Sequence, residues 1–126
     1  MAATLDAWWS DLFASIDAKN SLGFVEFLSP DAEFRFGNAP AVVGRADIAA
    51  AVAGFFETIA RSRHDIVRTW HDAATRVCQG EVTYGRRDGS EITLPFVNVF
   101  EMQGNKVARY SIYIDIAPLY AGDASG

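Results

Sequence analysis

Hydrophobic residues in the first part of the chain recur at intervals of three and four, which is the spacing of an amphipathic helix. The positions are Leu5, Trp8, Trp9, Leu12, Phe13 and Ile16. They predict a helix over residues 4–18, with Thr4 as its cap. A short second helix begins at Ser21 and must end near Ser29, because Pro30 disfavours helical geometry in the residue before it.

The period of the pattern changes after Asp31. Residues 32–36 predict a strand, and residues 45–60 predict a third helix, whose buried stripe is Ile48, Val52, Phe55, Phe56 and Ile59. Four later segments, separated by turn residues, alternate as antiparallel strands do, and they cover residues 64–72, 75–86, 91–103 and 106–119. Pro95 lacks a backbone donor, which predicts a bulge or an unpaired position in its strand.

The order of these elements predicts a single α+β domain over residues 1–120, followed by a flexible tail over residues 121–126. The last two strands are apolar on both faces: Phe96 and Phe100, for example, alternate with Val97 and Val99. Three modest helices can cover only one face of the sheet. The other face is therefore predicted to meet a second copy of the chain, which gives a homodimer through the outer face of the sheet.

Composition narrows the possible partners. The 126 residues carry a net charge of −5 and have a pI of about 4.8, which argues against binding to nucleic acid or to an anionic membrane surface. The chain has no apolar stretch near the about 20 residues that span a bilayer and no signal-peptide pattern, so a cytoplasmic location is expected. Cys78 is the only cysteine, and neither metal-ligand spacing nor a glycine-rich phosphate loop is present, so neither a metal nor a cofactor is expected.

The order helix, short helix, strand, helix and long meandering strands resembles the nuclear transport factor two superfamily. The segment VGRADIAAAVAGFF is similar to the usual entry into the third helix of that superfamily, and RYSIYIDIAPLY is similar to the last strand of its SnoaL-like and limonene-epoxide-hydrolase-like members. The resemblance implies a cone-shaped roll, in which a curved, mostly antiparallel sheet wraps around three N-terminal helices and encloses an apolar cavity. It also implies a homodimer.

Ketosteroid isomerases, another branch of this superfamily, carry their catalytic groups at positions that differ in this chain. Their first-helix tyrosine falls at Leu12, their catalytic aspartate at Phe36 and their second acid at Asn98. The combination of an enolising aspartate with an oxyanion-hole donor pair is therefore missing.

Limonene epoxide hydrolases use two aspartates bridged by an arginine, with a tyrosine and an asparagine that hold the water. Asp115 matches their acid on the last strand. Glu81 and Thr83 fall at the positions of the arginine and the other aspartate, and Phe34 and Phe36 fall at those of the tyrosine and the asparagine. Neither known apparatus is complete in this sequence.

Asp115 is the leading candidate for proton transfer, because it is flanked by Ile114 and Ile116 and a carboxylate in an apolar cavity has a raised pKa. The alternative is an aspartate that hydrogen-bonds a helix terminus. Tyr113 lies two residues earlier and therefore on the same face, where it would either orient a substrate oxygen or act as an ordinary core tyrosine.

Three further residues are candidate assistants to Asp115. Glu81 would share a proton with Asp115, or would simply face outward from the sheet. His64 and His71 are the only histidines, and their opposite parity puts them on opposite faces of a regular strand. One of them, with His71 as the candidate, would be a base, and a structural histidine is the alternative.

Two hypotheses for function follow. The first is a SnoaL-like enzyme that performs cofactor-free acid–base chemistry, such as isomerisation, cyclisation, dehydration or epoxide opening, on a small apolar substrate. Its substrate-binding residues would be Trp9, Phe13, Phe36, Phe55, Trp70 and Asn98. The second is a non-catalytic ligand-binding or dimerisation module of the same fold. An open cavity with Asp115 at its floor favours the enzyme, and a sealed cavity without a carboxylate favours the module.

Overall fold

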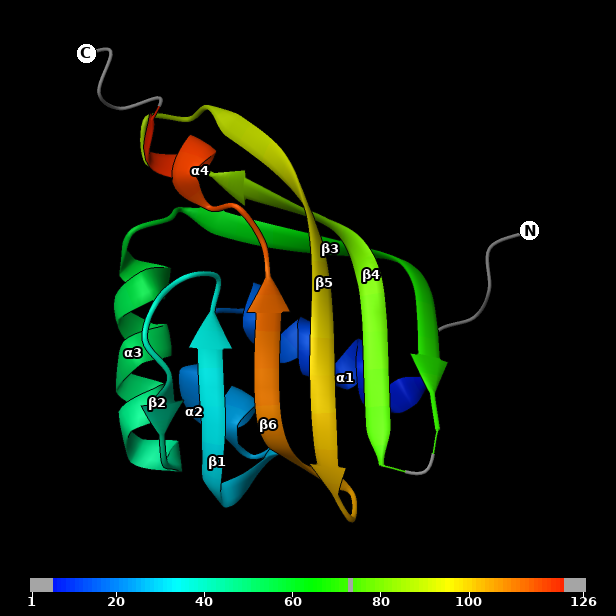
Figure 1. Cartoon of the computed structure of the whole chain (residues 1–126). Coiled ribbons are helices and arrows are strands. Elements are labelled where there is room, and N and C mark those ends of the chain that lie inside the picture. The colour runs from blue at the N-terminus through cyan, green and yellow to red at the C-terminus, as the bar shows by residue number, and fades with distance from the viewer. Residues whose placement is uncertain (1–5, 73, 122–126) are drawn as a thin grey trace.

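The computed structural model describes residues 6–72 and 74–121, which form one curved sheet with helices against its concave face (Figure 1). The six strands lie in the order β2-β1-β6-β5-β4-β3. The helices are α1 (Ala7–Asp17), α2 (Ser21–Val25), α3 (Arg45–Glu57) and α4 (Ala117–Ala121). The strands are β1 (Leu28–Phe36), β2 (Val42–Val43), β3 (Arg61–His71), β4 (Thr75–Gly85), β5 (Glu91–Gln103) and β6 (Lys106–Tyr113).

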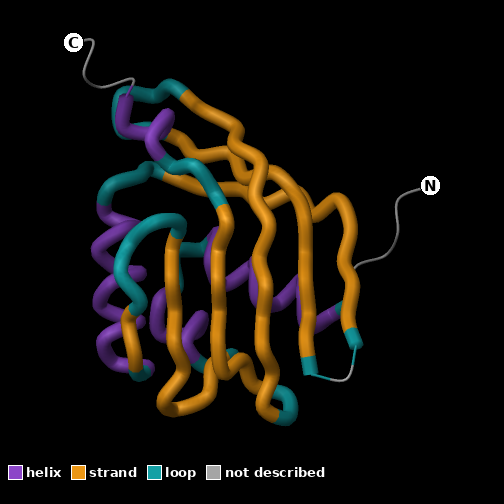
Figure 2. The backbone as a smooth tube through the Cα atoms, in the orientation of Figure 1, coloured by secondary structure: helices purple, strands orange, loops and turns teal. Residues whose placement is uncertain are grey.

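All neighbouring strands are antiparallel except β1 and β6, which pair in parallel. The strands form one continuous curved wall, and α1 and α2 lie behind it while α3 flanks β1 and β2 (Figures 1 and 2). This arrangement confirms the α+β fold with a curved, mostly antiparallel sheet around three N-terminal helices. Within the described ranges, residues 6–72 and 74–121, no helix is long and apolar enough to cross a membrane.

The helix α1 begins at Ala7, three residues later than its hydrophobic spacing predicts, and Thr4 lies outside the described residues. Its end is sharp, because Lys19 adopts a left-handed φ of 59° that cannot continue a helix. The Asn20 side chain then accepts a hydrogen bond of 2.9 Å from the Gly23 N–H and caps α2. This tight connection fixes Asp17, the last residue of α1, against the rest of the fold.

The C-terminal strand is shorter than predicted. β6 ends at Tyr113 rather than near residue 119, and the chain continues into α4. The Asp115 Oδ1 accepts a hydrogen bond of 3.1 Å from the Ala117 N–H, and Pro118 is compatible with the first turn of a helix, where no N–H is needed. Ala121, predicted to begin a flexible tail, is the last residue of α4, and the remainder of that tail lies outside the described residues.

The predicted bulge at Pro95 is absent, and the register shifts at three other places in the described sheet. The β4–β5 register runs through the Glu81↔Pro95 pair without a shift, and β6 pairs with β5 only from Val97 onward, so the missing N–H of Pro95 interrupts no ladder with β6. The register shifts instead within β1 between Leu28 and Glu33, within β3 between Ile66 and Arg68, and within β5 between Glu101 and Met102. Bulges of this kind bend and twist a sheet, which suits the curved wall.

The β3 bulge also changes the expected position of the two histidines. His64 pairs with Val82 and His71 with Arg76, and these two β4 residues are an even number of positions apart. Both histidines therefore lie on the same side of β3, and not on opposite faces as a regular strand would place them. Val82 is buried against the helices, so the shared side is the concave one.

Two glycines provide a matched test of the packing of this sheet and its helices. A Cβ at Gly80 would collide with the carbonyl oxygen of Asp65 on the neighbouring strand, next to the β3 bulge, whereas a Cβ at Gly54 in α3 meets nothing within 4 Å. We expect Gly80→Ala to lower the free energy of unfolding by about 1–3 kcal/mol. We expect Gly54→Ala to raise it by about 0.5–1 kcal/mol, since alanine favours the helix. Urea denaturation measures both, and a Gly80→Ala variant as stable as the wild type would contradict the β3–β4 packing.

Candidate functional site

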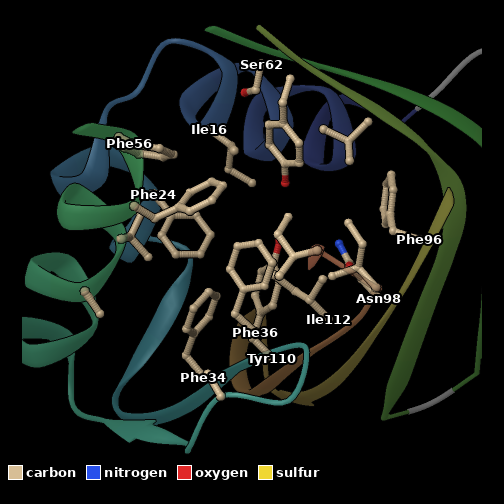
Figure 3. Close-up of a pocket in the computed structure, with 18 of the residues that line it drawn as sticks. Ile16, Phe24, Phe34, Phe36, Phe56, Ser62, Phe96, Asn98, Tyr110 and Ile112 are labelled. Carbon is tan, nitrogen blue, oxygen red and sulfur yellow. The ribbon is translucent and has the colours of Figure 1, made fainter. Parts of the chain in front are cut away.

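An apolar cavity of about 310 Å³ lies between the helices and the concave face of the sheet. Its size is at the lower end of the range for small-molecule sites, about 300–1,000 Å³. Aromatic and branched aliphatic side chains form most of its wall, among them Phe24, Phe34, Phe36, Phe55, Phe56, Phe96, Ile112, Ile114 and Ile116 (Figure 3). The exposed residues of its lining are Ala39, Pro40, Ala51 and Tyr120, so the cavity opens between the loop after β1, α3 and α4.

The small helix α4 covers part of this opening. Arg86 donates hydrogen bonds of 2.9 and 3.0 Å to the carbonyl oxygens of Leu119 and Pro118. Tyr120, which lines the cavity, has its hydroxyl 3.1 Å from the Thr58 hydroxyl at the end of α3. These bonds tie the end of the chain to the rim of the cavity.

Asp115 and Tyr113 do not face the cavity, and the prediction that they do is wrong. The opposite set of side chains, Ile112, Ile114 and Ile116, lines the cavity, so alternation points Tyr113 and Asp115 outward. Tyr113 is 63% exposed, and Asp115 is exposed and bonds the first turn of α4. The isoleucines occupy the inner face because burying a carboxylate among apolar groups is far more costly than burying an alkyl chain.

Three other predicted site residues also lie away from the cavity. Glu81 is exposed on the convex face, where it cannot share a proton with an inward acid. Trp70 follows the β3 bulge, points to the same convex face and is 47% exposed. His71 lies on the concave side but at the end of β3, where it is exposed and outside the cavity lining.

The structure does bring together the other predicted substrate-binding residues. Phe36, Phe55 and Asn98 line the cavity. Trp9 and Phe13 are buried directly behind its wall, with their rings stacked at 6.3 Å and 7°. Trp9 and Phe13 therefore support the lining and do not form it.

A polar network at the inner end of the cavity joins α1 to β3. The Asp17 Oδ1 lies 2.6 Å from His64 Nδ1 and accepts a hydrogen bond of 2.9 Å from the Ser62 hydroxyl. The Asp17 Oδ2 accepts a hydrogen bond of 3.0 Å from the His64 backbone N–H. Ser62 and His64 alternate along β3 so that both line the cavity, while Asp17 lies behind them.

Two opposing effects set the pKa of Asp17. Burial raises the pKa of this carboxyl, and the hydrogen bonds and charge of His64, together with the Ser62 hydroxyl, outweigh burial and hold it below its ordinary value. The pair therefore contributes stability at pH values above the unfolded carboxyl pKa of about 3.9, and this contribution is lost as the pH falls through the lower folded pKa. Asp17 also ends α1, where the helix dipole disfavours an anion, so the donors from β3 are needed there.

The His64 ring is held in one orientation. It packs against Phe13 at 4.9 Å and Phe96 at 5.4 Å between ring centroids, and its side chain is 9% exposed. Because an ionised Asp17 can only accept, Nδ1 of His64 carries the proton that it donates to Asp17. The other ring nitrogen, Nε2, holds the lone pair of a neutral ring, and because His64 lines the cavity this makes it a candidate general base.

Two buried polar atoms of residues in the cavity lining have no hydrogen-bond partner among the described residues. They are the Asn98 Oδ1 and the Tyr110 hydroxyl, on side chains that are 3% and 1% exposed as whole residues. Leaving a buried polar group unpaired costs about 1–3 kcal/mol. Burial also raises the pKa of the neighbouring Cys78 thiol to about 12, although hydrogen bonds from Asn98 act in the opposite direction.

A metal site built from several acidic or thiol side chains is not visible in the described part of the chain, where no three His, Cys, Asp or Glu residues come together.

The sequence did not single out Asp17, which is the partner that gives His64 its orientation. One feature of the sequence does point to Asp17: it is an acid at the end of a helix whose last turn has no basic residue. The helix dipole disfavours an anion there, so Asp17 needs a partner from another element. The cavity is open, as the enzyme hypothesis requires, but the residue that lines it is His64 and not Asp115.

Solved structures share this architecture over most of their length. An NTF2-like protein of unknown function from Burkholderia pseudomallei superposes with a TM-score of 0.81 at 16% identity, over 90% of this chain and 92% of that one. A protein with a ketosteroid isomerase-like fold from Catenulispora acidiphila, in complex with trimethylamine, gives 0.83 at 12% identity, over 94% and 92%. A candidate polyketide cyclase from Xanthomonas campestris gives 0.78 at 15% identity, over 90% and 92%.

At these identities the likeness shows the fold alone, and it confirms the predicted nuclear transport factor two-like fold. No curated protein matches the sequence. Residues 9–110 match the SnoaL-like domain family, a range that runs from the first helix to the Tyr110 position of the last strand. The chain therefore belongs to the SnoaL-like domain family.

Proposed function

We propose that this chain is an enzyme that performs general acid–base catalysis on a small, largely apolar molecule bound in the cavity. His64 is the proton-transfer group, and Asp17 is a positioning residue that acts through it. The observation that carries the proposal is the Asp17–His64 hydrogen bond of 2.6 Å at the wall of an otherwise apolar cavity. A cytoplasmic site of action belongs to the same proposal, and the buried single thiol of Cys78 is consistent with it.

The proposed proton transfer follows from the geometry of the pair. Nε2 of His64 removes a proton from the bound molecule, and the Asp17 carboxylate stabilises the imidazolium that forms. The same imidazolium then returns the proton to a different atom of the molecule. Isomerisation, cyclisation, dehydration and epoxide opening all contain such a step, and the aromatic walls keep competing water away from it.

Names given to structural neighbours agree with this class of chemistry. The proteins from Xanthomonas campestris and Pseudomonas putida are described as candidate polyketide cyclases. Cyclisation of that kind requires a base to remove a proton next to a carbonyl group. The proposal for this chain depends on its own His64 and Asp17, since those neighbours share only the fold with it.

A Kemp elimination tests the proposal without knowledge of the natural substrate. The probe 5-nitrobenzisoxazole is small and apolar, and removal of its ring C–H proton by a base releases a coloured phenolate. We expect saturable catalysis by the wild type and a loss of about 100-fold or more in kcat/KM for His64→Gln. The other histidine offers a matched control: His71→Gln should retain full activity, because its side chain is exposed outside the cavity.

The Asp17→Asn variant adds a readout that a purely structural role would not produce. Removing the carboxylate removes the charge that stabilises a protonated His64, so the lower apparent pKa of the rate profile should move to lower pH. Equal losses in His64→Gln and His71→Gln, or an unchanged His64→Gln, would contradict the proposal. Binding of the probe without any acceleration would favour the non-catalytic binding module.

We also infer that the convex face of the sheet is the interface of a homodimer. Among the described residues, no helix covers this face, and it exposes Trp70 and Tyr113 by 47% and 63% (Figure 1). Arg109 on this face lies 3.6 Å from Glu33 and 3.2 Å from Glu101, so part of the negative charge there is neutralised locally. A second copy can therefore approach without a large like-charge penalty.

Analytical ultracentrifugation at micromolar concentration tests the dimer. We expect the wild type to sediment as a dimer and the Trp70→Glu Tyr113→Glu double variant as a monomer, because burying two new charges at the interface is costly. Leu22→Glu is the control, since Leu22 is 72% exposed on α2, away from the convex face. A wild type that sediments only as a monomer would overturn the inference.

A further inference from the structure

Asn98 and Tyr110 each carry a buried polar atom, the amide oxygen and the hydroxyl, that the described residues of the chain leave unpaired. Both residues line the cavity, and they are 3% and 1% exposed. In the sheet, Asn98 pairs with Ile112 and Tyr110 pairs with Phe100 on adjacent strands. The two side chains therefore occupy neighbouring diagonal positions on the concave face, where side chains about 7–8 Å apart at their bases can reach a common group.

The surroundings of each side chain fix which atom it offers. The Tyr110 ring packs against Phe24 at 5.4 Å, Phe34 at 5.4 Å and Phe100 at 4.2 Å between centroids, so its hydroxyl cannot swing away to water. Asn98 lies opposite Cys78 in the β4–β5 ladder, close enough for its amide to lower the pKa of that thiol against the effect of burial. The Asn98 Oδ1, a pure acceptor, has no partner among the described residues.

The pairing of a pure acceptor with a hydroxyl selects the chemistry of the ligand. The Asn98 Oδ1 needs a hydrogen from the ligand, which a ketone, an ether or a hydrocarbon cannot supply. The Tyr110 hydroxyl stays protonated, since burial raises the pKa of Tyr110 well above its usual value, and it can donate to a ligand oxygen. A ligand hydroxyl satisfies both atoms at once, while an ammonium group would have to be buried among apolar walls.

The geometry points to Asn98 and Tyr110 as a recognition site for the hydroxyl group of a neutral, ring-containing ligand, an alcohol or a phenol, held between the aromatic walls of the cavity. The ligand hydroxyl donates to the Asn98 Oδ1 and accepts from the Tyr110 hydroxyl. Phe24 and Phe34 provide aromatic faces against Tyr110, and Figure 3 shows Phe96 on the side of Asn98. This inference rests on the proposed function only in naming the ligand as a substrate, since binding itself requires no catalysis.

Three naphthalene derivatives separate hydroxyl recognition from apolar burial. The probe 2-naphthol both donates and accepts, 2-methoxynaphthalene only accepts, and naphthalene does neither. Binding to the wild type, followed by isothermal titration or by ligand fluorescence, should be about 10-fold tighter for 2-naphthol than for 2-methoxynaphthalene, a ratio typical of one well-made buried hydrogen bond. Equal affinities for the two would overturn the site.

Two variants test whether the preference for 2-naphthol depends on the Asn98 Oδ1 and the Tyr110 hydroxyl. Asn98→Leu and Tyr110→Phe keep the approximate shape of each side chain and remove its polar atom. Each should weaken the binding of 2-naphthol about 10-fold and leave the binding of naphthalene unchanged. Tyr110→Phe should also melt at or above the wild-type temperature, because its hydroxyl has no partner in the described protein, and a clear loss of thermal stability would overturn the assignment.

The binding experiment and the Kemp elimination can fail separately. A hydroxyl preference that depends on Asn98 and Tyr110, in a protein without base catalysis, supports the site and refutes the proposed enzyme. Base catalysis that depends on His64, in a protein without hydroxyl preference, supports the enzyme and refutes the site. If 2-naphthol loses affinity in both variants but naphthalene loses as much, the two side chains shape the cavity and recognise no hydroxyl.

Discussion

Alternation of side chains along β3 to β6 determines which groups the cavity contains. Successive side chains of a strand point to opposite faces of the sheet. Where an isoleucine of β6 points into the cavity, the next residue therefore points away from it. Ile112 faces inward and Tyr113 outward, and the same alternation continues to Ile114 and Asp115 beyond the end of the strand. The inner surface is consequently mostly apolar, and its few polar side chains lie at strand positions that point inward.

The Asp17–His64 pair connects this inner surface to the helical layer. Asp17 accepts hydrogen bonds from the Ser62 hydroxyl and the His64 backbone N–H and is paired with the His64 ring, so the end of α1 is held against β3. Lys19, just beyond the end of α1, donates a hydrogen bond of 2.9 Å to the Ile59 carbonyl, at the entry to the same strand. A single junction thus stabilises the fold and orients the candidate base. Substitutions at Asp17 should affect both properties together.

The sequence is sufficient to predict the architecture, but it is not sufficient to predict the candidate functional site. The helical spacing of Trp9, Leu12 and Phe13, and the turns between later strands, predict the elements because each signal is local. The choice of face for β6 is not local: both alternating sets contain large apolar or aromatic residues, and only packing against the helices decides between them. The β3 bulge has no glycine or proline at its own irregular step, and its one sign in the sequence is Gly80 on the neighbouring strand, which only the pairing of β3 with β4 connects to it. The partners Asp17 and His64 are 47 residues apart, and no spacing rule joins them.

The protonation state of the His64 ring tests the central claim most directly, because catalysis by this residue requires a lone pair on the nitrogen that faces the cavity. A long-range proton–nitrogen correlation spectrum at neutral pH distinguishes the two ring nitrogens, and the His71→Gln variant leaves His64 as the only histidine signal. For the neutral form of the ring the account predicts a proton on Nδ1, donated to Asp17, and an unprotonated Nε2. A proton on Nε2 with Nδ1 bare would turn the lone pair toward Asp17, and it would contradict the assignment of His64 as the base of this cavity.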